Sequence, residues 1–148
     1  MVAKDIAQIF IDTFENKGKV LICGNGGSAT QSSHFADELL SKYKVIRRPL
    51  PAVALTDPGV ITAIGNDFGF DQIFSRQVLA LGNKNDLLIA ISTSGKSENV
   101  NNAIGMAHFK GLKVIEWPRV GEDIGKIQGY QLQLMHDVCE IVEVYYDN

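Results

Sequence analysis

The chain has 148 residues and a formal net charge of -3, with 14 basic residues against 17 acidic ones. This length is that of one ordinary domain, so we expect a single domain over residues 1–148. The acidic balance provides no basic face for a nucleic acid or an anionic membrane. The apolar runs are too short to span a bilayer and the N-terminus lacks a signal segment, so we expect a soluble cytoplasmic protein.

Short apolar segments alternate with amphipathic segments along the sequence. Helical periodicity predicts the helices Ala3–Asn16, Ser28–Tyr43, Phe70–Leu81, Ser97–Phe109 and Ile124–Tyr146. Apolar runs between them predict the strands Lys19–Cys23, Ala52–Leu55, Asp86–Ile91 and Lys113–Glu116. Each run is too uniformly apolar for a strand with one face in water, which indicates strands buried in a parallel sheet.

The order of strands and helices predicts an α/β fold of three layers, with a parallel sheet flanked by helices as in flavodoxin-like and Rossmann-like folds. Ligands of such folds bind at the carboxyl ends of the strands. We therefore expect the functional loops directly after Cys23 and Ile91.

A loop rich in hydroxyl groups follows the third predicted strand. It contains Ser92, Thr93, Ser94 and Ser97, and a predicted helix begins at its end. Hydroxyls and the backbone N–H groups at the positive end of a helix are donors that suit a phosphate dianion. A turn with Ser97 as the helix N-cap accounts for part of the pattern. Four hydroxyls exceed the needs of one cap, so we favour a phosphate-binding loop.

The loop after the first predicted strand contains Gly24, Asn25, Gly26, Gly27 and Ser28. Its spacing matches neither the dinucleotide motif G-x-G-x-x-G nor the P-loop motif G-x-x-x-x-G-K, so we predict no nucleotide cofactor. The glycines would let the main chain lie flat against a ligand, with polar contacts from Asn25 and Ser28. A tight turn between strand and helix explains the same glycines equally well.

Titratable side chains have helical spacing on two predicted helices. His34 and Glu38 are one turn apart and share a helix face next to the first loop. Pairs with this spacing are more often solvated ion pairs than catalytic or metal sites. Gln128 and His136 lie about two turns apart on one side of the last helix. Taken alone, His136 would be a structural histidine.

A further polar pair, Asn66 and Asp67, follows the apolar run Val60–Ile64. This pattern is typical of a turn that ends a helix. The residues alone assign it no function.

Taken in order, these separated motifs resemble the sugar isomerase (SIS) domain family, and within it the sedoheptulose-7-phosphate isomerases, also called phosphoheptose isomerases. The resemblance runs from about Gly18 to Ile115 and resumes at about Ile127. The residues that carry it are Gly24, Asn25, Gly26, Gly27, Ser28, His34, Glu38, Asn66, Asp67, Ser92, Thr93, Ser94, Gly95, Ser97, Gln128 and His136.

The resemblance implies an aldose–ketose isomerase that makes D-glycero-D-manno-heptose 7-phosphate for bacterial surface polysaccharide. It also implies a homotetramer with its sites at subunit interfaces. The implied substrate contacts are Asn25, Gly26, Gly27, Ser28, Asn66, Asp67, Ser92, Thr93, Ser94, Ser97 and Gln128. The implied ligands of one zinc ion per subunit are His34, Glu38, Gln128 and His136. Isomerisation through an enediol needs a base and an acid, and Glu38 and His136 fit these roles.

The segment Glu116–Gly121 departs from the family pattern. The family has a further turn, strand and acidic loop between Ile115 and the last helix, whereas here the connection is direct. Gly125 stands where the family has a substrate-contacting aspartate. Two explanations are open: one strand of the sheet is deleted in this protein, or a segment that carries it is missing from the sequence at this point.

Two other functions would use the same phosphate loop. A noncatalytic SIS-domain protein of the replication-initiator-associating type binds without an acid–base pair, but such proteins replace the residues at the positions of Glu38 and His136. An isomerase or sensor of hexose phosphates is less consistent with the complete set of four implied metal ligands. The retained residues favour the heptose phosphate isomerase.

Overall fold

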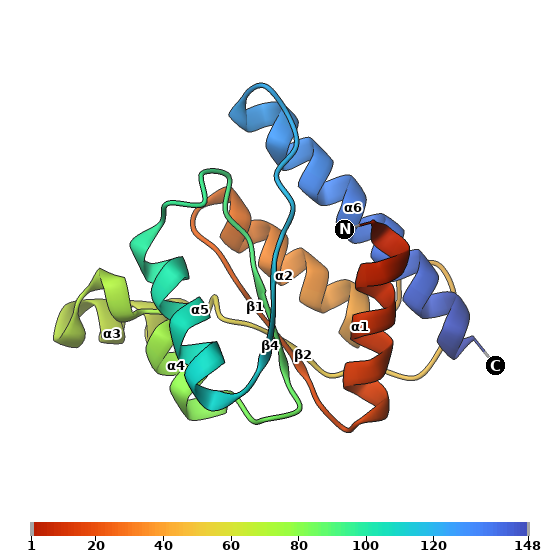
Figure 1. The fold of residues 1–148 in the computed structure, drawn as a ribbon, viewed down its shortest axis with the longest axis horizontal. Coiled ribbons are helices and arrows are strands. Elements are labelled where there is room, and N and C mark those ends of the chain that lie inside the picture. The colour runs from red at the N-terminus through yellow and green to blue at the C-terminus, as the bar shows by residue number, and fades with distance from the viewer. Residues whose placement is uncertain (1, 148) are drawn as a thin grey trace.

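The computed structural model describes residues 2–147, in which strands and helices alternate (Figure 1). The strands are β1 (Val20–Cys23), β2 (Ala52–Ala54), β3 (Leu87–Ala90) and β4 (Lys113–Glu116). The helices are α1 (Ala3–Glu15), α2 (Gly27–Leu40), α3 (Pro58–Phe68), the short 3-10 helix η1 (Phe70–Gln72), α4 (Ser75–Leu81), α5 (Glu98–Lys110) and α6 (Ile124–Tyr146). Among the described residues, no helix is both long enough and apolar enough to cross a bilayer.

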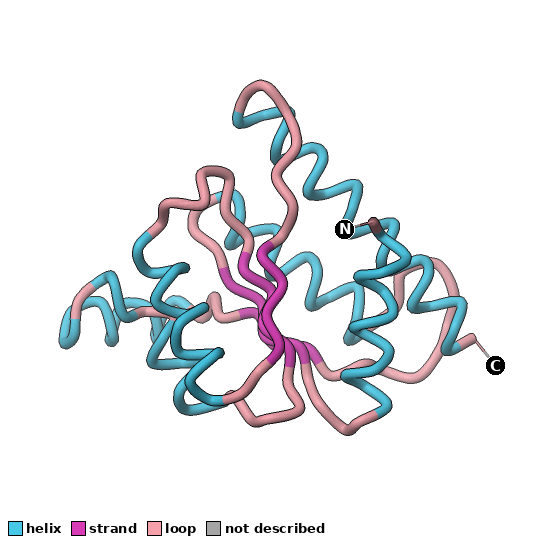
Figure 2. The backbone as a smooth tube through the Cα atoms, viewed as in Figure 1, coloured by secondary structure: helices cyan, strands magenta, loops and turns pink. Residues whose placement is uncertain are grey.

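The four strands form one parallel sheet in the order β2-β1-β3-β4, which confirms the predicted fold class (Figure 2). The two central strands, β1 and β3, are buried along their whole length, as expected for strands covered on both faces. The prediction that all four strands are buried was wrong for the two edges. Val53 of β2 and both Lys113 and Glu116 of β4 are exposed, because an edge strand has a neighbour on one side only.

Helices cover both faces of the sheet, and alternate side chains of β1 show how. Val20 and Ile22 pack in a core with α1, α2 and α6, whereas Leu21 and Cys23 pack in a second core with α4 and α5. Adjacent side chains of a strand point to opposite faces, so one strand contributes to both cores. In Figure 1, α3, α4 and α5 lie on one side of the sheet, and α1 and α6 lie on the other.

The region between β2 and β3 differs from the prediction of one helix over Phe70–Leu81. It contains α3, whose first turn is capped by Asp57 through a 3.0 Å bond from the Val60 N–H, with Pro58 as the first helical residue. Gly69, at φ +108, ends α3. The predicted helix itself is divided into η1 and α4, with the buried Ile73 and Phe74 at the junction.

The connection from β4 to α6 is short, as the sequence indicates. The Trp117 N–H donates to the Ala90 carbonyl at 2.8 Å and continues the pairing of β4 with β3 by one residue. The chain then reaches α6 without another strand, so the described residues form a sheet of four strands.

Candidate functional site

The loops that follow β1 and β3 lie side by side, because Cys23 and Ala90 are paired at the ends of these strands. The side-chain amides of Asn25 and the buried Asn99 connect the two loops through two reciprocal hydrogen bonds. Asn25 Nδ2 donates to Asn99 Oδ1 at 2.8 Å, and Asn99 Nδ2 donates to Asn25 Oδ1 at 2.9 Å. The glycine loop is thereby held at the start of α5.

The glycine loop approaches α2 closely. Ser28 is buried, and a Cβ built on Gly24 would lie 2.6 Å from the Ser28 Cβ, so a larger residue would force this turn apart. Gly26 and Gly27 are exposed. Their main chain is therefore accessible from outside.

The hydroxyl-rich loop after β3 is shaped by its own side chains. Ser92 Oγ accepts from the N–H groups of Ser94 and Gly95, and Ser94 Oγ accepts from that of Lys96. Ser97 is the N-cap residue of α5, yet its side chain makes no capping bond. Hydroxyl donors and the first N–H groups of α5 therefore remain available to an anion at this end of the sheet.

Three titratable side chains converge where α2 and α6 pack together. Glu38 Oε1 is 3.6 Å from His34 Nε2, and the rings of His34 and His136 have centroids 5.3 Å apart. One ligand atom from each of the three residues lies within 4.8 Å of the other two. Two ligands of a tetrahedral zinc ion are about 3.4 Å apart, given metal–ligand bonds of about 2.1 Å. Two imidazoles and a carboxylate at these spacings suit a zinc ion after small side-chain adjustments.

Tyr43, just beyond the end of α2, contacts this cluster. Its ring stacks on His136, with centroids 5.3 Å apart and planes 24° apart. The helix predicted to reach Tyr43 ends at Leu40, because Arg47 binds the last carbonyls of α2. Its Nη2 donates to the Glu38 carbonyl at 2.6 Å, and its Nη1 donates to the Leu39 carbonyl at 3.0 Å. The chain after α2 therefore turns back over His136.

A buried carboxylate on α6 holds that returning segment. Glu143 accepts from the backbone N–H groups of Tyr43, Lys44 and Val45 at 2.6 to 2.8 Å. Its Oε2 is also 3.2 Å from Arg47 Nε, an electrostatic contact without the alignment of a hydrogen bond. Burial would raise the pKa of Glu143, but these three N–H groups and Arg47 outweigh burial and lower it. The carboxylate is therefore charged and orders the loop that carries Tyr43.

Gln128 lies at the beginning of α6, next to the glycine loop. Its backbone carbonyl accepts from Gln31 Nε2 at 3.0 Å, and its own Nε2 would be 2.7 Å from a Cβ built on Gly27. Gln128 and His136 are about 12 Å apart along the helix axis, at 1.5 Å per residue. The structure thus places Gln128 beside the glycine loop and His136 farther along, beside His34 and Glu38.

The combination of this sheet, these loops and this cluster can be compared with known proteins. Residues 3–116 match the family model described as SIS domain. A phosphoheptose isomerase of Helicobacter pylori strain P12 is 42% identical, over 97% of this chain and 83% of its own length. A phosphoheptose isomerase of Aliarcobacter butzleri is 49% identical, over 91% of this chain and 67% of its own length.

The chain belongs to the phosphoheptose isomerase family of SIS-domain proteins.

Solved structures agree with this assignment. The phosphoheptose isomerase of Francisella tularensis has a TM-score of 0.92 and 38% identity, and that of Neisseria gonorrhoeae has a TM-score of 0.88 and 36% identity. Each comparison covers 96% of this chain and 85% of the other. The alignment with the H. pylori phosphoheptose isomerase spans 162 positions, more than the 148 residues of this chain. That relative therefore carries residues that this chain lacks.

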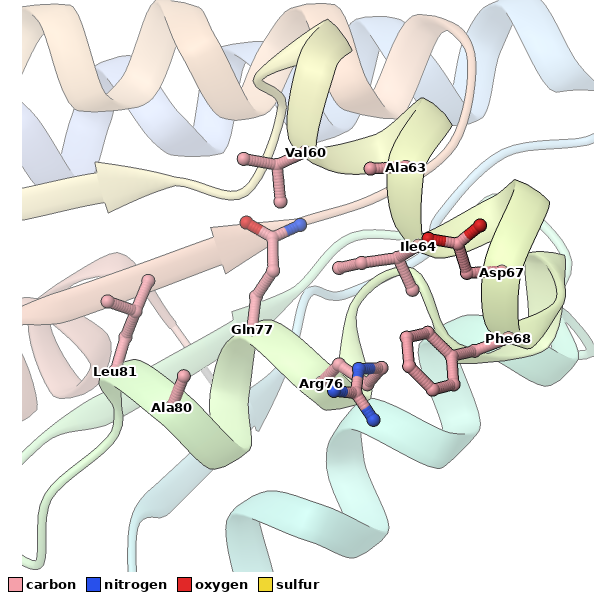
Figure 3. A pocket seen from close by; sticks show the side chains of 9 residues that line it. All are labelled: Val60, Ala63, Ile64, Asp67, Phe68, Arg76, Gln77, Ala80 and Leu81. Atoms are coloured by element: carbon pink, nitrogen blue, oxygen red, sulfur yellow. The ribbon is translucent and has the colours of Figure 1, made fainter.

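Two of the residues expected to contact substrate lie apart from the α2–α6 cluster. Asn66 and Asp67 are exposed in the last turn of α3, where Asn66 Nδ2 donates to Asp67 Oδ1 at 3.1 Å. Asp67 borders a pocket of about 400 Å³ between α3 and α4, and Figure 3 shows that mostly apolar side chains line the rest of it, together with Arg76 and Gln77. Partly buried residues of α3 pack on the α4–α5 face, whereas His34 and His136 lie on helices of the other face. One chain does not bring these groups together.

Sequence analysis did not single out Asn99 or Tyr43 as parts of the site. Asn99 is close to the phosphate loop in sequence, and Asn25 offers its amide a partner in the neighbouring predicted loop. The pairing of these two side chains could therefore have been predicted from the sequence. Tyr43 was placed at the end of a helix, where its ring would not face His136. No local pattern reveals the turn that Arg47 and Glu143 impose.

Proposed function

We propose that this chain is an aldose–ketose isomerase that converts sedoheptulose 7-phosphate to D-glycero-D-manno-heptose 7-phosphate in bacterial heptose biosynthesis. The convergence of His34, Glu38 and His136 carries the proposal, because these groups come from two different helices and lie close enough together to act on one substrate. A binding module would not need an acid–base pair there. The names of the relatives support the same substrate class.

The proposed chemistry is a proton transfer at two adjacent carbons. Glu38 removes a proton from C1 of the ketose while His136 donates a proton to the carbonyl oxygen at C2, which gives an enediol. Loss of the proton from the C1 hydroxyl and return of a proton to C2 then give the aldose. Atoms and electrons balance within the substrate, so the reaction needs no oxidant or nucleotide cofactor.

We propose that the same cluster holds one zinc ion per subunit through His34, Glu38 and His136. A bound zinc ion would polarise the substrate carbonyl as a Lewis acid. Gln128 stays a predicted fourth ligand and substrate contact, next to Gly27. If Glu38 binds the metal, its second carboxylate oxygen is the one left to accept the proton.

We propose that the phosphate is bound by Ser92, Thr93, Ser94 and Ser97, and that Asn25, Gly26, Gly27 and Ser28 border the sugar. These two loops are neighbours at one end of the sheet and are joined by the Asn25–Asn99 amide pair. The phosphate would thus be placed at the start of α5 and the reacting carbons nearer α6.

We also propose a cytoplasmic homotetramer with its sites at subunit interfaces, as the family resemblance implies. The position of Asn66 and Asp67 supports this, because they need a second subunit to reach an α2–α6 cluster. The apolar helix α3 has no buried residue in the single chain, so a second copy of this chain could cover it.

The test of the proposed function is incubation of the purified protein with sedoheptulose 7-phosphate and with pentulose and hexulose phosphates. We expect aldose product, scored by NMR, from the heptulose phosphate in preference to the shorter ketoses. Binding of sugar phosphate without any aldose would instead identify a noncatalytic phosphosugar-binding protein.

A further inference from the structure

The side chain of Arg119, in the short connection between β4 and α6, lies directly on the phosphate loop. A Cβ built on Gly95 would be 2.7 Å from Nη2 of Arg119, 2.8 Å from its Cζ and 3.0 Å from its Nη1. Gly95 also has φ +70, a conformation that favours glycine. The absence of a side chain at Gly95 is therefore what leaves room for the guanidinium.

This guanidinium has no acidic partner among residues 2–147. The nearest acidic residues in sequence are Glu116, Glu122 and Asp123. Glu116 makes no ion pair in the described part of the chain, and Glu122 and Asp123 interact with Lys126, through its ammonium at 3.1 Å and its N–H at 2.9 Å. Arg119 itself makes no ion pair or hydrogen bond in the described part of the chain. An arginine has five N–H donors and a permanent positive charge, so all of these remain available.

The backbone that carries Arg119 is fixed relative to the phosphate loop. The buried Trp117 donates through its indole Nε1 to the Gln131 carbonyl at 3.0 Å. Gln131, fully buried on α6, donates through Nε2 to the Ser92 carbonyl at 3.0 Å. One residue of α6 thus holds both the segment before Arg119 and the first residue of the loop.

We propose that Arg119 binds the phosphate group of the substrate together with the Ser92–Ser97 loop. The hydroxyls and N–H groups of that loop are neutral, whereas a phosphate monoester is close to a dianion at neutral pH. A planar guanidinium matches two phosphate oxygens and supplies charge-assisted hydrogen bonds. The direct connection from β4 to α6 places this cation at the loop. This inference rests on the proposed function, because it takes a sugar phosphate as the ligand.

The experiment compares Arg119→Gln and Arg119→Lys with the wild-type protein by calorimetric titration with sedoheptulose 7-phosphate and with inorganic phosphate. Arg48→Gln is the matched control, because this exposed arginine stacks on Tyr146 at the far end of α6. We expect Arg119→Gln to lower the affinity for both ligands by about tenfold or more, as for loss of a hydrogen bond to a charged group. Arg119→Lys should recover part of the affinity, and Arg48→Gln should bind as the wild type does.

If Arg119→Gln binds both ligands with wild-type affinity, the inference is overturned. If Ser97→Ala binds them more weakly in the same experiment, the Ser92–Ser97 loop is still the phosphate site, without Arg119. If the wild type binds both ligands with this Arg119 dependence but makes no aldose, the proposed function fails and the inference stands. Failure of the wild type to bind either ligand would refute both the loop and Arg119. Arg119 is exposed, so thermal unfolding should confirm that its variants remain folded.

Discussion

The α2–α6 cluster and the phosphate loop are built differently. Around the cluster, the side chains of Arg47 and Glu143 are almost fully buried, with 1% and 3% exposure, and they bind backbone groups of the turn that carries Tyr43. The phosphate loop is partly exposed and is shaped by short bonds from its own hydroxyls. A reacting group must be held in one orientation, whereas a phosphate can be bound by several interchangeable donors.

This difference predicts which property a substitution in each region should change. Changes in the cluster or in the groups that orient it should alter turnover strongly. Changes in the loop should alter binding, with smaller consequences for the chemical step.

The largest expected effect is that of Glu38→Gln on turnover. This change keeps the size of the side chain and removes the basic carboxylate, so kcat should fall by about two to four orders of magnitude, as for loss of a general base. Steady-state kinetics with sedoheptulose 7-phosphate would measure it. The zinc content of each variant must be measured beside the rate, so that loss of a metal is distinguished from loss of a base.

His136→Gln serves as the partner of that experiment. If both residues act in one proton-transfer step, the double variant should lose less than the sum of the two single losses in activation free energy. Fully additive losses would indicate that the two groups act in separate steps.

An effect of similar size, on stability and not on turnover, is expected for Glu143→Gln. Removing one partner of a buried ion pair typically costs about 3 to 5 kcal/mol, because the remaining charge is left uncompensated. Denaturant unfolding would measure the loss. The control is Glu140→Gln, three residues earlier on α6, where the pair with Lys44 is more than half exposed and should contribute much less.

Glu143→Gln should also change how stability depends on pH in the acid range. The pKa of Glu143 is lowered in the folded protein, so its stabilising effect is complete above the unfolded glutamate pKa of about 4.3 and is lost as pH falls through the lower folded value. The wild type should therefore lose stability relative to Glu143→Gln over that interval. Equal acid sensitivity of the two proteins would show that Glu143 carries no such charge.

The smallest effect is expected for the double variant Ser94→Ala and Ser97→Ala. Ser94 is exposed, and the half-buried Ser97 makes no capping bond, so the free energy of unfolding should change by less than about 1 kcal/mol. Affinity for sugar phosphate should fall by about 1.5 to 3 kcal/mol, as for lost hydrogen bonds to a charged group. Calorimetric titration would detect this, and unchanged affinity would place the phosphate elsewhere.

Much of the fold follows from local patterns in the sequence. Continuous apolar runs identify β1 and β3, and helical spacing places His34 and Glu38 on one face, because both signals lie within one element. The neighbouring positions of the two loops follow from the general rule for parallel sheets.

Other features depend on contacts between distant segments, and no local period encodes them. The exposure of β2 and β4 depends on strand order, and the turn at Tyr43 depends on Glu143, which is far away in sequence. The same is true of Arg119, whose position on Gly95 is set through Trp117 and Gln131. Side-chain groups of this kind become visible only when the packing of α6 is known.

The most direct test of the central claim is the reaction of sedoheptulose 7-phosphate with the wild-type protein in D₂O, followed by NMR. A base that abstracts a proton and exchanges it with solvent should give aldose that carries deuterium at C2, and Glu38→Gln should abolish nearly all of this product. Absence of aldose from the wild type, or labelled aldose from Glu38→Gln at the wild-type rate, would contradict the account.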